Sequence, residues 1–227
     1  MNAQNISRFA LVASLCCVTV DAVIAAGFTA GYSKVDITPG NGTPISGYYS
    51  PRLSEGALDP LHARCVAMSD GEKTAFVISV DNLQLDSSII DRIKDGIASK
   101  TKVHGDAIFI ACTHTHTGAA WTPGWAKGPE AKARVEDANN LLVAGCTAAA
   151  AKAMADLAPS KILVGRGEAK DISFIRRFKM KDGSTWTCPP INDPNIDHPI
   201  GTLDQRVHVL RFDREGGCSI AGRLAGG

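Results

Sequence analysis

The chain has 227 residues, which is long enough for one sizeable domain with its own core. Apolar residues make up 44% and charged residues 21%, so the composition is that of a globular protein and argues against a disordered or fibrous chain. The formal net charge is +1 and no block of like charges occurs, which argues against a nucleic-acid-binding surface.

The first 26 residues differ from the rest of the chain. Arg8 closes a short polar start, residues 9–20 are apolar, and small residues follow at positions 22–26. This order predicts a secretory signal peptide over residues 1–26 and a chain exported to the periplasm or secreted. The apolar run is shorter than the roughly 20 residues that span a bilayer, and Asp21 interrupts it, so we expect no stable transmembrane span.

Five cysteines remain after the predicted signal peptide, at positions 65, 112, 146, 188 and 218. An odd number without a C-x-x-C pair predicts neither a disulfide framework nor a structural zinc site. Cys65 and Cys112 lie in apolar runs and are expected to be small buried side chains. One disulfide stays open as an alternative.

In chain order, strands are expected at residues 31–38, 61–68 and 74–80, with a Ser-Asp-Gly turn joining the last two. Asp86 can then cap a helix whose isoleucines recur every four residues from Ile89, which gives it one apolar face. Residues 107–112 form a continuous apolar run, which is typical of a strand covered on both faces.

The second half begins with a long helix over residues 130–157, with Pro129 suited to its first turn. A strand is expected at residues 161–168, and hairpins around residues 174–183 and 207–224. Strands that alternate with helices and then dominate predict an α/β fold. We expect a mixed sheet flanked by helices, with a β-hairpin-rich C-terminal portion.

The strongest candidate site is residues 113–118, with the sequence THTHTG, directly after the apolar strand. In an extended segment, side chains two residues apart point to the same side, so His114 and His116 can converge on one point. Imidazole is a common metal ligand and zinc accepts nitrogen ligands. The alternative is two polar loop histidines with no shared role.

Asp81 directly follows the strand at residues 74–80. If that strand is the neighbour of residues 107–112, the carboxylate would lie beside the histidines, where it could orient an imidazole or bind metal itself. The alternative is an aspartate that accepts hydrogen bonds from loop amides. Arg176 and Arg177 fall on a predicted strand, where only one of them can face a cleft, and a guanidinium suits polar head groups.

Several common catalytic motifs are absent from the chain. It contains no G-x-S-x-G elbow, no H-E-x-x-H helix, no Walker loop and no G-x-G-x-x-G after a strand. A lipase-like triad, a zincin protease and a nucleotide-dependent enzyme are therefore disfavoured.

Six segments, taken in order, resemble the N-terminal domain of neutral/alkaline non-lysosomal ceramidases. They are GYSKVDITP at 31–39, GY at 47–48, DPLHAR at 59–64, CTHTHTG at 112–118, RR at 176–177 with MKDG at 180–183, and LD at 203–204 before VHVLRFD at 207–213. The resemblance covers nearly everything after the signal peptide, so residues 27–227 are expected to form a partial catalytic domain.

The resemblance implies a zinc-dependent hydrolase of the amide bond of N-acylsphingosine, a lipid amide. It also implies that His114 is a zinc ligand and that His116 is a neighbouring active-site histidine that contacts substrate. Arg176, with Arg177 as the alternative, matches a substrate-contacting arginine, and Gly47 falls in the loop that borders the pocket. Zinc would polarise the amide carbonyl and activate a water molecule.

Two departures from the family pattern affect this prediction. The family's further zinc ligands and a serine discussed as catalytic come after the end of this chain, and Gly118 is followed by Ala119 where the family usually has proline. A catalytic zinc normally needs three protein ligands. The chain is therefore expected to be a truncated or partial form whose own activity is doubtful.

Two other functions compete with this prediction. The first is a secreted, non-catalytic remnant or partner-binding fragment without metal, with an exposed apolar edge where further strands would pair. The second is an H-x-H metallohydrolase on a (β/α)₈ barrel, which is disfavoured because such barrels need about 250 residues. The sequence does not indicate an oligomeric state.

Overall fold

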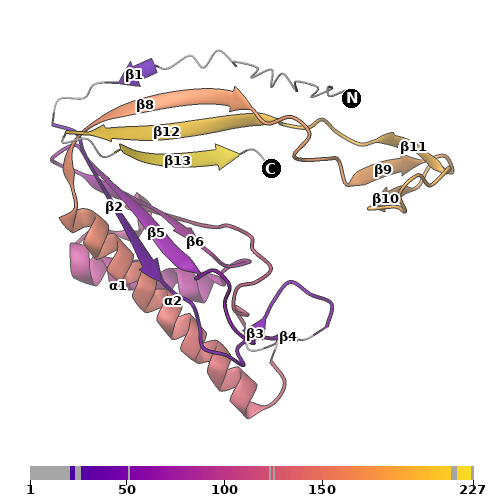
Figure 1. Cartoon of the computed structure of the whole chain (residues 1–227), viewed down its shortest axis with the longest axis horizontal. Coiled ribbons are helices and arrows are strands. Elements are labelled where there is room, and N and C mark those ends of the chain that lie inside the picture. Colours follow the sequence, from indigo (N-terminus) through magenta and orange to yellow (C-terminus); the bar gives the residue numbers. More distant parts are fainter. Residues whose placement is uncertain are drawn as a thin grey trace, which may run out of the picture. The chain divides into compact units, whose positions relative to one another are not determined.

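The computed structural model describes residues 21–23, 27–50, 52–122, 124, 126–215 and 219–225, with the backbone alone for 21–23 and 221–225. The predicted signal peptide and its cleavage site lie outside these residues, except for the backbone of the short strand β1 (Asp21–Val23). The chain divides into two compact units (Figure 1). The larger consists of residues 23–162 and 212–220, and the smaller contains residues 163–211 and 221–227.

The larger unit is built on a mixed sheet with the strand order β2-β5-β6-β7. These strands are β2 (Thr29–Asp36), β5 (His62–Ser69), β6 (Thr74–Val80) and β7 (Ile108–Cys112). Strands β2, β5 and β6 run antiparallel to one another, whereas β7 runs parallel to β6. The α/β fold with a mixed sheet is confirmed, and so is the pairing of the strand before Asp81 with the strand before the histidines.

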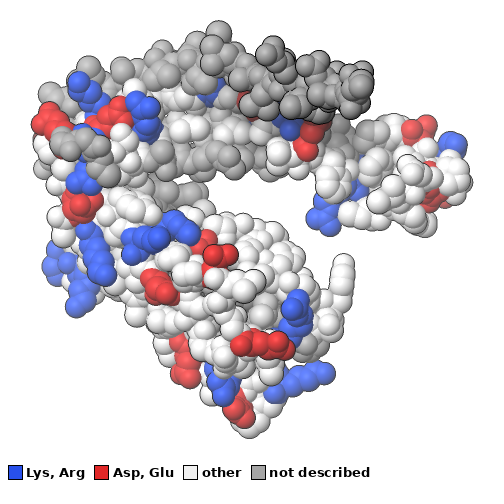
Figure 2. Space-filling view, viewed as in Figure 1, with Lys and Arg blue, Asp and Glu red and all other residues white. Residues whose placement is uncertain are grey.

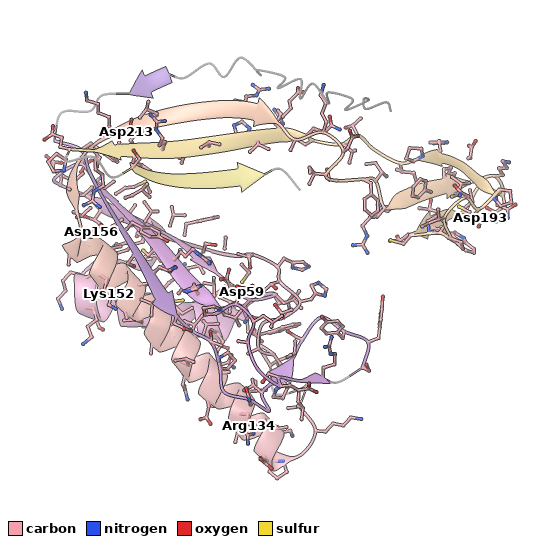
Figure 3. All side chains as sticks on the ribbon, in the orientation of Figure 1. Asp59, Arg134, Lys152, Asp156, Asp193 and Asp213 are labelled. Carbon is pink, nitrogen blue, oxygen red and sulfur yellow. The ribbon has the colours of Figure 1, made fainter. Side chains whose placement is uncertain are left out.

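Two helices cover one face of this sheet (Figure 1). Helix α1 (Ser87–Thr101) starts as predicted, because the carboxylate of Asp86 accepts a hydrogen bond from the N–H of Ser87, and it buries Ile89, Ile93 and Ile97. Helix α2 (Pro129–Ala155) begins with the proline in its first turn. Arg134 and Lys152 mark its two ends (Figure 3).

The core lies between the helices and the sheet. Phe76, Ile78 and Val80 of β6 are fully buried there, against Ile93 of α1 and a row of alanines on α2. Burying one such side chain contributes roughly 1.5–3 kcal/mol. Gly31 lets α2 approach β2, since a Cβ there would collide with the backbone carbonyl of Ala153. This packing gives the end of β6 and β7 a rigid support.

Strand β7 differs from its prediction. An apolar run covered on both faces was expected, yet Phe109 keeps 59% of its surface exposed. Phe109 is paired with Val77, and both point away from the helices. The reason is that α1 and α2 lie on the same side of the sheet, so neither helix covers Phe109, which points to the other side.

The smaller unit is rich in strands, as predicted for the C-terminal portion. It holds a three-stranded sheet in which β9 (Arg177–Met180) pairs antiparallel with β10 (Thr185–Thr187) and with β11 (Ile196–Pro199). The long strands β8 (Ala158–Glu168), β12 (Arg206–Arg214) and β13 (Ser219–Ala225) pair in the order β13-β12-β8. The first residues of β8 pair with β2.

Charged residues of both signs are interspersed over the face shown in Figure 2. This distribution agrees with the formal net charge of +1. Within the described residues, no helix has the length and apolar character needed to cross a membrane.

Candidate metal-binding histidine pair

The histidine segment begins where β6 and β7 end together. The N–H of Thr113 donates to the carbonyl of Val80 at 3.0 Å, and the same carbonyl accepts from the N–H of Asn82 at 2.9 Å. Parallel strands place their carboxyl ends at one edge of a sheet, where ligand-binding loops gather in α/β proteins. The segment at residues 113–118 and the turn after Val80 are therefore joined at this edge.

His114 and His116 lie side by side in this segment. Their ring centres are 5.3 Å apart, the ring planes differ by 74°, and both residues are exposed to solvent. Two imidazoles bound to one tetrahedral zinc, with zinc–nitrogen bonds of about 2.0–2.1 Å, have ring centres about 5 Å apart. The separation of the pair is thus compatible with shared ligation of one metal ion.

The way in which the two rings meet differs from the prediction. Alternation along an extended segment was expected, but His114 has a φ of 60°, in the left-handed region. This conformation is uncommon for residues other than glycine and costs about 1–2 kcal/mol. The chain turns at His114 instead of continuing β7, and the turn together with two hydrogen bonds sets the positions of the rings.

Each imidazole is held by a backbone carbonyl. Nδ1 of His114 donates to the carbonyl of Leu83 at 3.0 Å, and Nδ1 of His116 donates to the carbonyl of Gly47 at 2.7 Å. A carbonyl oxygen can only accept, so in the neutral ring the hydrogen must be on Nδ1. Nε2 then carries the free lone pair, as metal-ligating histidines require, and the carbonyl keeps the ring oriented.

Gly47 is part of this arrangement through its backbone. Its φ is +96°, and a Cβ at this position would lie 2.5 Å from Nδ1 of His116. A side chain at residue 47 would therefore displace the imidazole. The resemblance placed Gly47 beside the substrate pocket, and the structure places it against His116.

Tyr48 and Arg52 extend the contacts around His116 and were not predicted from the sequence. The Tyr48 ring lies edge-on to His116, with ring centres 6.3 Å apart. The guanidinium carbon of Arg52 lies 4.4 Å above the centre of the Tyr48 ring, a cation–π contact. In the sequence, Tyr48 was noted only as part of the Gly-Tyr pair that resembles the family, and nothing connected it with His116.

The described contacts of Asp81 are with residues of β5 and not with the histidine pair. Its carboxylate accepts from Nη1 of Arg64 at 2.7 Å and from the N–H of His62 at 2.9 Å. Among the described contacts, none joins Asp81 to His114 or His116. Side chains alternate between the faces of a strand, and the carboxylate follows the face that carries Arg64. These hydrogen bonds tie β5 to the end of β6.

The ligand set fits zinc in kind but is short in number. No His, Cys, Asp or Glu joins the two histidines to make a group of three within the part of the chain that the structure describes. Cys112 ends the strand before the segment, but burial raises the pKa of its thiol to about 11, so it is protonated at neutral pH. A catalytic zinc normally has three protein ligands, and the two imidazoles could provide two of them.

Arg176 and Arg177 lie in the smaller unit and are both exposed. Arg176 precedes β9, its Nε donates to Sγ of Cys188 at 3.2 Å, and its carbonyl accepts from the N–H of Cys188 at 2.7 Å. Arg177 begins β9 and pairs with Thr187. Of the two, Arg176 is thus the one whose guanidinium is held by a neighbouring side chain.

A cavity of about 180 Å³ lies elsewhere in the larger unit. It is lined by Pro39, Gly40, Thr43, Arg134, Asp137, Ala138 and Leu141. Neither His114 nor His116 is among these residues, so the histidine pair belongs to the open surface rather than to this cavity.

Comparison with known proteins matches a family profile and several solved structures. The family profile "Neutral/alkaline non-lysosomal ceramidase, N-terminal" matches residues 28–222. The crystal structure of neutral ceramidase from Pseudomonas aeruginosa is similar, with a TM-score of 0.62 and 20% identity over 86% of this chain and 31% of that one. A ceramidase complexed with C2 has a TM-score of 0.61 and 19% identity over 86% and 30% of the two chains.

A search of curated proteins found no match. The chain spans less than a third of the length of the two solved ceramidases. At about 20% identity these structures establish the shared fold.

Proposed function

The chain belongs to the neutral/alkaline non-lysosomal ceramidase family, and on this premise we propose that it carries part of the active site of a zinc-dependent hydrolase of lipid amides. The substrate class is an N-acylsphingosine, which is cleaved to sphingosine and a fatty acid. The observation that carries the proposal is the histidine pair, with ring centres 5.3 Å apart and each Nδ1 bound to a backbone carbonyl.

The residues of this chain have distinct parts in the proposal. Nε2 of His114 holds the metal, and Nε2 of His116 serves as a second ligand or as a hydrogen-bonding group toward the substrate. Zinc, when bound, polarises the amide carbonyl and lowers the pKa of a bound water. By the family resemblance, Arg176, with Arg177 as the alternative, is the residue proposed to contact substrate through a guanidinium fork. Within the described residues, no third His, Cys, Asp or Glu joins the pair.

Metal titration tests the ligand role directly. Zinc or cobalt is added to the metal-free chain, and binding is followed by calorimetry and by the visible absorption of cobalt. We expect one metal ion per chain, with binding lost in His114→Ala. His104→Ala is the matched control, since His104 is also an exposed histidine of the larger unit and no described contact joins it to the pair.

Hydrolysis is tested with an N-acylsphingosine that carries a fluorescent acyl chain. We expect cleavage to depend on zinc and to be lost in His114→Ala but not in His104→Ala. Cleavage that persists in the metal-free protein, or metal binding that survives in His114→Ala, would overturn the proposal.

A non-catalytic, partner-binding chain is the second candidate. The pair provides two possible metal ligands among the described residues, and the exposed ring of Phe109 lies on the face of the sheet opposite the helices. Absence of metal binding and of hydrolysis in the folded chain would favour this candidate over the hydrolase.

Export is also part of the proposal, and the order of polar, apolar and small residues in positions 1–26 supports it. Expression in a bacterial host should yield a periplasmic or secreted chain that begins near residue 27. Intact-mass measurement of the exported protein tests this, and a cytoplasmic chain that retains Met1 would contradict it.

A further inference from the structure

Asn82 is a buried polar residue next to the histidine segment that the proposed function does not use. It is 1% exposed, and its Oδ1 accepts a hydrogen bond from the N–H of Leu83 at 2.9 Å. Its Nδ2 has no hydrogen-bond partner among the described residues. A buried amide donor without an acceptor is unfavourable and rare in folded proteins, so an apolar residue would suit the burial better.

The side-chain oxygen of Asn82 explains why this buried position carries a polar residue. The N–H of Leu83 needs an acceptor, and Oδ1 of Asn82 supplies it. The carbonyl of the same leucine then accepts from Nδ1 of His114 at 3.0 Å. Leu83 is therefore held at its N–H by Asn82 while its carbonyl holds the imidazole.

Asn82 also lies against Gly118, the last residue of the histidine segment. A Cβ on Gly118 would lie 2.5 Å from Oδ1 and 3.0 Å from Cα of Asn82. The near end of the segment, at Thr113, shares the carbonyl of Val80 with the N–H of Asn82. Both ends of residues 113–118 thus come to the turn that contains this asparagine.

We propose that Asn82 is a positioning residue for His114. Its side-chain oxygen fixes Leu83 so that the leucine carbonyl holds the hydrogen on Nδ1 of His114 and leaves Nε2 free for a metal ion. His116 is anchored separately by the carbonyl of Gly47, so its ring does not depend on this amide. The inference deepens the proposed function and rests on it for the identity of His114 as a metal ligand.

The test uses the nitrogen NMR signals of isotope-labelled histidines in the metal-free chain. In a neutral imidazole the two nitrogen signals report which one carries the hydrogen, so the spectra are recorded at alkaline pH. Asn82→Leu removes the acceptor oxygen at similar volume. We expect His114 to lose its preference for hydrogen on Nδ1 while His116 keeps it, and zinc affinity to fall by about 10–100-fold.

Asn82→Asp is the conservative partner variant, because it retains an oxygen that can accept from the N–H of Leu83. We expect it to preserve the Nδ1–H form of His114. Loss of that form in folded Asn82→Asp would overturn the proposal even if Asn82→Leu failed to fold.

Two outcomes with Asn82→Leu would also overturn it. Unchanged signals from both histidines would mean that the amide oxygen does not position His114, and loss of the Nδ1–H form in both rings would mean a general collapse of the loop. The proposed function would fail on its own if Asn82→Leu changed the His114 signals as expected while the unsubstituted chain bound no zinc.

Discussion

Replacing Gly47 by alanine should displace His116 rather than only strain the backbone, and Gly71 provides a matched control. The φ values of the two glycines are +96° and +94°, so alanine costs each about 1–2 kcal/mol of backbone strain. A Cβ at Gly47 would lie 2.5 Å from Nδ1 of His116, whereas nothing lies within 4 Å of a Cβ at Gly71. Only the first substitution adds a collision with the ring.

The magnitude of the difference follows from the contact that is lost. Moving the imidazole breaks its hydrogen bond to the carbonyl of Gly47, which contributes about 0.5–1.5 kcal/mol. Gly47→Ala should therefore lower the free energy of unfolding by about 1.5–3.5 kcal/mol, and Gly71→Ala by the strain alone. Zinc affinity should fall by about 10–100-fold in Gly47→Ala, as is typical when the hydrogen-bond partner of a ligand is removed.

Urea unfolding gives the two stabilities, and metal titration gives the two affinities. Histidine NMR should also show that His116, but not His114, changes in Gly47→Ala. Equal loss of zinc affinity in both glycine variants, or an unchanged His116 signal in folded Gly47→Ala, would refute the reasoning.

Two further predictions concern reactivity and acid stability. Burial raises the pKa of the Cys146 thiol to about 12, whereas Cys188 is exposed. Iodoacetamide near neutral pH should therefore modify Cys188 in the folded chain and reach Cys146 only after unfolding. Peptide mapping that finds equal rates of modification at the two cysteines would contradict this prediction. The pKa of Asp156 is lowered by the hydrogen bond from the N–H of Tyr32 and, to a smaller extent, by that from Arg214. The stability that the Asp156 carboxylate contributes is therefore present above the unfolded-state pKa of about 3.9, and it is lost as pH falls through the lowered value. Asp156→Asn should lower the urea midpoint at neutral pH and have little effect at the acid end, and an equal effect at both would contradict it.

Local sequence patterns predicted the regular elements because the forces that form them are local. The isoleucines of α1 recur at the helical period, and Asp86 caps the first turn as a side chain of that type should. The hairpin of β5 and β6 follows from two strand-forming runs around a Ser-Asp-Gly turn. For β7 the same approach gave the strand but overestimated its burial, because composition does not report which face a distant helix covers.

The candidate site was only partly predictable. The sequence THTHTG and its place after a strand identified His114 and His116, since histidine spacing is a chemical signal that can be read locally. The contacts of Asp81 were not predictable, because its partner Arg64 is 17 residues away and their meeting depends on the pairing of β5 with β6.

The class of fold, the family and the two histidines that could hold a metal ion were all predicted from the amino-acid sequence. The groups that orient these histidines became known from the folded chain. The carbonyl of Leu83 is 31 residues from His114, and that of Gly47 is 69 residues from His116. Backbone carbonyls are the same in every residue, so no side-chain pattern marks the ones that fix an imidazole; their role arises only when folding brings these distant turns to the end of β7.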